Sequence, residues 1–141
     1  MAAEIGLGVA VEIPEGIFNV VGEWRYSGMA AQWWLWELDA GEGQTRLLAR
    51  VDNTCYCPHV EKVGEFPSGA VLDFEGTQFA LHDHGEARVE RSAGEAHDFW
   101  RARFQIFSAP GKILVFTEDR GDTHRMAGEE LDAKLVQVYQ S

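Results

Sequence analysis

The chain has 141 residues, with 12 basic and 23 acidic side chains and a formal net charge of -11 at neutral pH. A charge of this sign repels nucleic-acid phosphates and anionic lipid surfaces, so it excludes nucleic acid as a partner and favours cationic or neutral ones. The length is typical of one domain, which buries roughly two thirds of the surface of the unfolded chain. We therefore expect a single domain over residues 1–141.

The start of the chain lacks the basic residues and the apolar length of a signal or membrane-spanning segment. Glu4 and Glu12 flank a short apolar run. The two cysteines, Cys55 and Cys57, are two positions apart and cannot join distant segments, which is typical of a reducing compartment. We expect a cytoplasmic protein that does not insert directly into a membrane.

The first half of the chain alternates apolar and polar side chains with the period of two that is typical of half-buried strands. Residues 18–26 place Phe18, Val20, Gly22, Trp24 and Tyr26 on one face. Residues 31–38 also fit a helical spacing, but their aromatic content favours a strand that returns through the turn Asp39-Ala-Gly-Glu-Gly.

The second half gives the clearest alternation, in residues 99–107. The turn Ser108-Ala-Pro-Gly then leads into residues 112–117, which predicts a β-hairpin. Residues 128–135 are moderately helical, and we expect a helix or a turn there before a last strand that ends at Tyr139.

The middle of the chain matches itself 66 positions later without a gap, so that Trp34 aligns with Trp100. With a short change in length the match extends upstream, where residues 18–21 align with residues 79–82. A repeat of this size indicates two copies of one supersecondary unit, each too small to bury a core alone.

We therefore expect an all-β fold with little helix, built from a first β repeat over residues 16–66 and a second over residues 70–139. The two antiparallel units are predicted to be related by an approximate two-fold axis. They would pack into one β-sandwich or double-barrel domain.

These patterns resemble a bacterial family known as domain of unknown function 4178. The resemblance covers residues 16–139 and rests on strand and turn motifs: Gly16-Ile-Phe-Asn-Val-Val-Gly, Trp34-Leu-Trp-Glu-Leu, Phe74-Glu-Gly-Thr-Gln-Phe-Ala-Leu, Gly85-Glu-Ala-Arg-Val and Ile113-Leu-Val-Phe-Thr-Glu-Asp. It implies an all-β fold and an accessory role beside membrane-stress or polyamine-related systems. It supplies no catalytic residues.

A possible metal site lies outside those motifs, at Cys55, Cys57 and His59, with His82 or His84 as a fourth ligand. Zinc prefers these ligand types, but structural sites favour a Cys-x-x-Cys turn, whereas side chains two apart on a strand stand roughly 7 Å apart. We therefore expect two small buried thiols, two exposed loop histidines and no bound metal or other cofactor. Metal ligation and a strained disulfide remain the alternatives.

The leading functional prediction is a non-catalytic binding or adaptor module, because the sequence contains no catalytic constellation. Its partner would be a protein or a small cationic ligand, bound at the seam between the two repeats by Trp33, Glu118 and Asp119. Trp33 points away from Trp34 and is expected to be exposed. The sequence leaves the oligomeric state open.

Two alternatives remain. One is a small metal-dependent enzyme that uses Cys55, Cys57 and His59, or an acid-base pair such as His82 with Glu118. The other is a purely structural subunit that associates through sheet edges.

Overall fold

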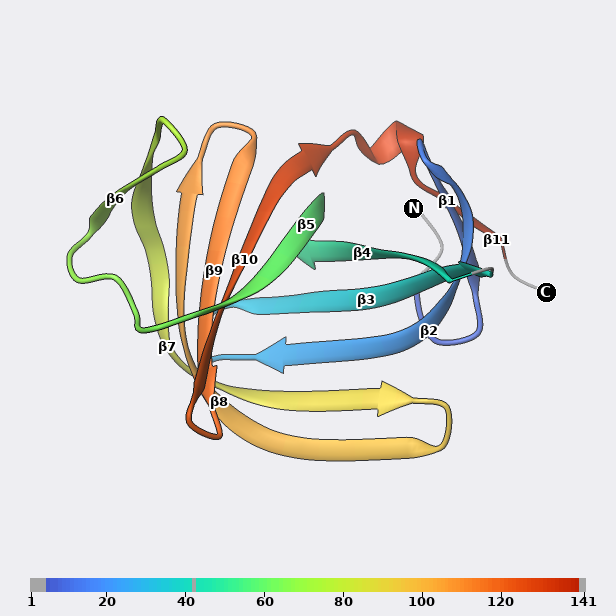
Figure 1. Cartoon of the computed structure of the whole chain (residues 1–141), viewed down its shortest axis with the longest axis horizontal. Helices are drawn as coiled ribbons and strands as arrows, with labels where there is room; N and C mark the ends of the chain where they lie inside the picture. The colour runs from blue at the N-terminus through green and yellow to red at the C-terminus, as the bar shows by residue number, and fades with distance from the viewer. Residues whose placement is uncertain (1–4, 42, 140–141) are drawn as a thin grey trace.

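The computed structural model describes residues 5–41 and 43–139, so Glu4 of the predicted start and Glu42 of the first predicted hairpin lie outside the described residues. The described chain is almost entirely β-structure (Figure 1). Its strands are β1 (Ala10–Ile13), β2 (Gly16–Ser27), β3 (Gln32–Gly41), β4 (Gln44–Val51), β5 (Thr54–Val63), β6 (Val71–Phe74), β7 (Thr77–Ala93), β8 (Ala96–Ala109), β9 (Lys112–Asp119), β10 (Asp122–Leu131) and β11 (Gln137–Tyr139).

One antiparallel sheet contains all of these strands, in the order β11-β1-β2-β3-β4-β5-β10-β9-β8-β7-β6. The sheet closes on itself because β2 also pairs with β7, and the result is an eight-stranded barrel with extra strands. The all-β prediction is confirmed. The sandwich or double barrel is not confirmed, since a single sheet forms a single barrel.

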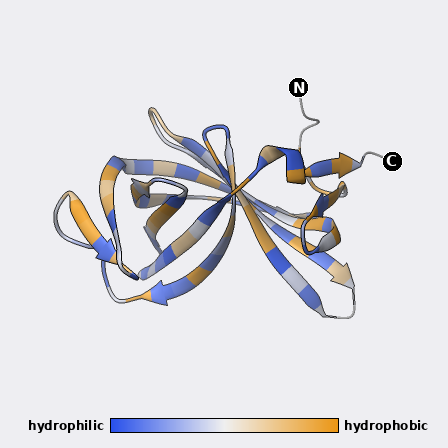
Figure 2. Cartoon of the chain, turned by 90° about the horizontal axis from the view of Figure 1, so that it is seen from above, coloured by the Kyte–Doolittle hydropathy of each residue, from blue (hydrophilic) through white to orange (hydrophobic). Residues whose placement is uncertain are grey.

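The inside of the barrel is filled by a cluster with members from all eight barrel strands, among them Trp33, Val51, Phe104 and Met126. Such a cluster must lie in the interior because strands on opposite sides of the barrel contribute to the same contacts. Apolar and polar residues alternate along the strands, as Figure 2 shows, so each strand sends every second side chain inward.

The extra strands cover parts of the outer surface, β1 and β11 on one side of the barrel and β6 on the other (Figure 1). Under β1 lies an outer cluster that includes Phe18, Val20, Trp36 and Leu38, and we call it the β1 cluster. Under β6 lies a second outer cluster, the β6 cluster, of Phe79, Phe107, Leu114 and Phe116.

Strand β3 is consequently buried on both faces. Trp33 points into the barrel and is only 1% exposed, while Trp36 and Leu38 pack in the β1 cluster. The prediction that Trp33 is exposed is therefore wrong. The alternation of side chains correctly places Trp33 and Trp34 on opposite faces of β3. It cannot show that other parts of the protein cover both of these faces.

A β-bulge in β2 also changes a predicted face. The pairing with β3 shifts register between Val20 and Gly22, and a single inserted residue turns all later side chains to the other face. Phe18 and Val20 therefore lie in the outer β1 cluster, whereas Trp24 and Tyr26 pack inside the barrel. The prediction that these residues share one face is wrong.

The C-terminal segment corrects the helical prediction. Strand β10 continues to Leu131, and only a short 3-10 helix, Ala133–Leu135, precedes β11. Within residues 5–41 and 43–139, no helix has both the length and the apolar character needed to cross a membrane.

The gapless alignment of the two halves does not bring the first residues of corresponding strands together. It pairs Arg46 with Lys112, the first residue of β9, but β4 begins earlier, at Gln44. Trp34 packs against the outer β1 cluster, whereas Trp100 lines the inside of the barrel. The predicted equivalence of Trp34 and Trp100 is therefore wrong in its register.

Candidate ligand site in the barrel

A cavity of about 280 Å³ lies inside the barrel, and we call it the barrel cavity. Four aromatic rings form much of its wall, and they come from three strands: Trp24, Tyr26, Trp33 and Trp100. Aliphatic side chains from five strands complete the apolar part: Leu35, Leu47, Val60, Val115 and Met126. The volume is just below the usual range of about 300–1,000 Å³ for small-molecule pockets.

Ring-ring contacts hold two of the four rings, Tyr26 and Trp33, in place. Tyr26 and Trp33 have ring centroids 4.8 Å apart and planes 3° from parallel. The other contact of Trp33 is edge-on to Phe104, also with 4.8 Å between centroids. Rings packed in this way lose little further freedom when a ligand binds, which favours affinity.

Asp119, at the end of β9, supplies the only carboxylate among the lining residues of the described chain. Its Oδ2 atom accepts a hydrogen bond of 2.9 Å from Nε1 of Trp100, which fixes both side chains at the rim. Burial, together with the negative charge of Asp119, raises the pKa of Tyr26.

Two arginines stand over rings of this wall without lining the cavity themselves. The guanidinium of Arg120 lies 4.4 Å from the centroid of Trp100, and that of Arg91 lies 5.0 Å from that of Trp24. Each contact is a cation-π interaction that orients the tryptophan ring.

Glu118 does not join this site. It precedes Asp119 on β9 and therefore faces the outside of the barrel, where Nε of Arg103 donates a hydrogen bond of 2.9 Å to it. Of the three predicted ligand residues, the structure brings Trp33 and Asp119 together at the barrel cavity and leaves Glu118 outside.

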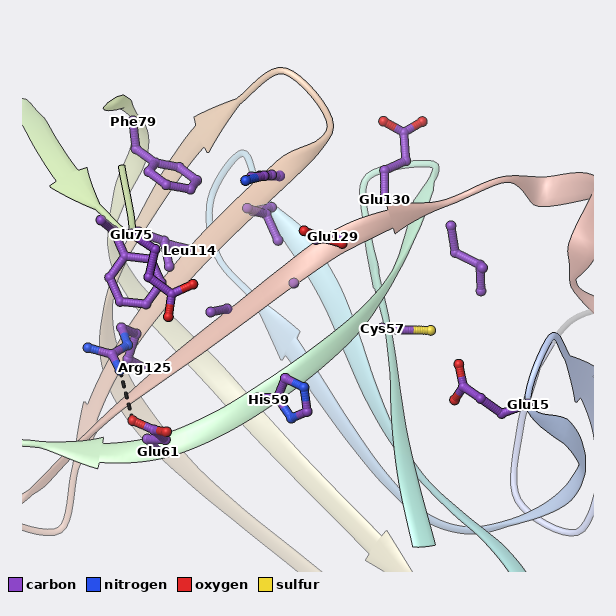
Figure 3. A pocket seen from close by; sticks show the side chains of 16 residues that line it. Glu15, Cys57, His59, Glu61, Glu75, Phe79, Leu114, Arg125, Glu129 and Glu130 are labelled. Atoms are coloured by element: carbon purple, nitrogen blue, oxygen red, sulfur yellow. Dashed lines mark hydrogen bonds and ion pairs between the residues drawn. The ribbon is translucent and has the colours of Figure 1, made fainter. Parts of the chain in front are cut away.

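A second hollow lies on the outer face of β5, β9 and β10, and we call it the acidic groove (Figure 3). Its volume is about 550 Å³. Its carboxylates come from two strands and two turns: Glu15, Glu61, Glu75, Glu129 and Glu130. Cys57 and His59 lie on its floor, and Arg125 pairs with Glu61 at 2.8 Å.

The residues of the predicted metal site do not form a cluster. Cys57 and His59 line the acidic groove, but Cys55 packs against the β1 cluster. No group of three His, Cys, Asp or Glu side chains in the described part of the chain has the geometry to hold a metal ion.

Both cysteines are free and half-buried thiols. Burial raises the pKa of Cys55, and burial, with the charges of Glu15 and Cys55, raises the pKa of Cys57. Figure 3 shows the sulfur of Cys57 directed towards Glu15. The thiolate is the form that binds metal, so these shifts also oppose metal binding.

His82 and His84 are exposed, but they lie within strand β7 and not in the loop that the sequence predicts. Nε2 of His82 lies 3.9 Å from Oδ2 of Asp52. The backbone N–H of His84 donates a hydrogen bond to Oδ1 of its neighbour Asp83. The structure therefore gives His82 and Glu118 different partners, and they do not form the acid-base pair that the sequence left open.

Sequence reasoning missed several residues of the barrel cavity, notably Trp24, Tyr26, Thr117 and His124. Alternation along β9 could have identified Thr117, since residues two positions apart on a strand face the same side and Thr117 is two positions from Asp119. For Trp24 and Tyr26 the bulge in β2 conceals the signal, and Gly22 is the one residue that marks this bulge in the sequence, since an isolated glycine within a strand is typical of a bulge.

The fold and the site together define an all-β barrel domain with an aromatic internal cavity. The family model described as Domain of unknown function (DUF4178) matches residues 6–132, and the chain belongs to this family. The resemblance drawn from the strand and turn motifs is thus confirmed. Neither a curated protein nor a solved structure matches the chain.

Proposed function

We propose that this protein is a non-catalytic binding module that takes a small organic cation into the barrel cavity. The observation that carries the proposal is the meeting of four aromatic rings and one carboxylate in a single internal cavity. Aromatic rings attract ammonium groups through their negative faces, and desolvation strengthens this attraction to about 2 kcal/mol.

The charge of the protein supports the same class of ligand. A net charge of -11 attracts cations over long distances and raises their local concentration. Asp119 then provides a fixed negative charge at the rim, where its bond to Trp100 already orients it. The affinity should weaken moderately with salt, because the carboxylate is partly shielded by the barrel.

We also propose that the two halves are copies of one β unit, in a register that differs from the gapless alignment. Strands β2 and β7 both contain a bulge at the same point, between Val20 and Gly22 and between Leu81 and Asp83. The offset that aligns the two bulges also aligns Phe18 with Phe79, and these rings pack in the β1 and β6 clusters respectively.

This duplication supports a site at the seam. The rings of the barrel cavity come from both halves, with Trp33 from the first and Trp100 from the second. The alternative of a metal-dependent enzyme at Cys55, Cys57 and His59 has less support, because no group of three His, Cys, Asp or Glu side chains among the described residues is placed to hold a metal ion.

Fluorescence titration of the purified protein tests the proposal, with choline as the probe and its neutral carbon isostere as the comparison. We expect choline to change tryptophan fluorescence saturably and the isostere to bind at least about tenfold more weakly. Asp119→Asn keeps an acceptor for Trp100 but removes the charge, and should weaken choline binding at least about tenfold.

Glu118→Gln is the matched control, because it removes the same charge one residue away on the opposite face of β9. It should change the affinity by less than about twofold, since its charge lies outside the barrel and is paired with Arg103. An absence of saturable binding, or equal effects of the two variants, would contradict the proposal.

A further inference from the structure

We infer that the cation carries one charged head and an apolar tail, with the head at Asp119 and the tail directed into the barrel. This inference rests on the proposed function and names the ligand class more closely, as a primary alkylammonium ion. It follows from how polarity and burial change along the walls of the cavity.

Strand β9 shows the gradient most clearly. Its inward side chains run from Val115, which is 2% exposed, through the half-buried hydroxyl of Thr117 to the half-buried carboxylate of Asp119. Two steps of two residues correspond to roughly 13 Å along a strand. A ligand lying along β9 would therefore meet a charge at one end and only apolar surface at the other.

Strand β10, which pairs with β9, repeats this arrangement. On β10, the half-buried His124 is followed inward by Met126, which is 6% exposed. On β3, the buried Trp33 and Leu35 line the cavity. Apart from Val60, which pairs with Met126 and is 38% exposed, the inner end of the cavity is therefore a wall of buried aliphatic and aromatic carbon, which suits an alkyl chain.

A second cationic group on the ligand would have no partner there. Asp119 is the one acid among the described residues that line the cavity, and its position is at the rim. A second ammonium would lie against Val115 or Met126 and lose its hydration without compensation.

The test is a calorimetric titration of the intact protein with four probes: tetramethylammonium, n-butylammonium, n-hexylammonium and the diamine of the same length as n-hexylammonium. We expect affinity to rise up to about fourfold for each added methylene from butyl to hexyl. The diamine should bind at least about tenfold more weakly than n-hexylammonium, because its second charge must be desolvated.

Leu47→Phe provides a second measurement, because this half-buried residue lines the cavity and a larger ring would shorten it. Leu47→Phe should reduce the gain in affinity from n-butylammonium to n-hexylammonium. It should leave the affinity for tetramethylammonium within about twofold of that of the unchanged protein. Val115→Ile, which adds a single methylene, serves the same purpose if Leu47→Phe does not fold.

The outcomes separate the two proposals. Binding of tetramethylammonium without any dependence on chain length, or equal binding of the diamine, would overturn the tail inference and leave the proposed function standing. No binding of any probe would overturn both.

Discussion

The barrel cavity and the acidic groove are both concave, yet they differ in what surrounds their charges. The groove is the larger, at about 550 Å³ against about 280 Å³, and it contains more carboxylates. Those carboxylates lie in water, where charges are screened, and Glu61 already pairs with Arg125. The cavity has a single carboxylate, but packed rings hold it and buried walls adjoin it.

Under the proposed function, volume and acidity do not by themselves make a binding site. Rigid, partly dehydrated surroundings make one charge more effective than several exposed ones. Substitutions in the cavity should therefore have large effects on stability or binding, and substitutions in the groove should have small ones.

The largest effect is expected from Trp33→Ala. The substitution removes a side chain that is 1% exposed, together with its contacts to Tyr26 and Phe104, and should lower the free energy of unfolding by about 3–5 kcal/mol. His59→Ala on the exposed groove floor should change it by less than about 0.5 kcal/mol. Urea unfolding of both variants measures the two changes in the free energy of unfolding. Similar losses of stability in the two variants would contradict the difference between the cavity and the groove.

An intermediate effect is expected in the reactivity of the thiols. Because the pKa values of Cys55 and Cys57 are raised, both thiols are protonated at neutral pH and should react with iodoacetamide more slowly than a small free thiol. Their rates should still be rising above about pH 8.5, the usual thiol pKa.

Glu15→Gln sharpens this prediction, since it removes a charge that raises the pKa of Cys57 and not that of Cys55. Alkylation of Cys57 should become faster and that of Cys55 should not change. Mass spectrometry of the two modified peptides follows each residue separately. Fast alkylation of both thiols at pH 7 would contradict the raised pKa values of Cys55 and Cys57.

The smallest effect is expected from Glu129→Gln combined with Glu130→Gln at the edge of the acidic groove. Both side chains are exposed, so stability should stay within about 0.5 kcal/mol and choline affinity within about twofold of the unchanged protein. A tenfold loss of choline affinity would place the cation in the groove.

Much of the fold follows from alternation and turn residues. The period of two in residues 99–107 and the Pro110-Gly111 turn predict the β8–β9 hairpin, which the structure contains. The closure of the barrel is not predictable in this way, because the β2–β7 pairing joins segments from the two halves of the chain through backbone hydrogen bonds. Backbone pairing leaves no residue-specific signal in the sequence.

The site is predicted in part, and for an incorrect reason. The sequence singles out Trp33 and Asp119 as exposed residues near the seam, but they meet because both point into the barrel. Glu118 is grouped with Asp119 although successive residues of a strand face opposite sides. Once β9 is known to be a barrel strand, that rule alone separates the two acids.

The most direct test of the cavity as the ligand site is the indole N–H region of a proton-nitrogen NMR spectrum. The chain has five tryptophans, and three of them, Trp24, Trp33 and Trp100, line the barrel cavity. Trp34 and Trp36 lie on the outer face of β3 and serve as an internal control. Titration with n-hexylammonium or choline should shift the three cavity signals and leave the other two unchanged. Shifts confined to Trp34 and Trp36, or no shift at saturating concentrations, would contradict ligand binding in the barrel.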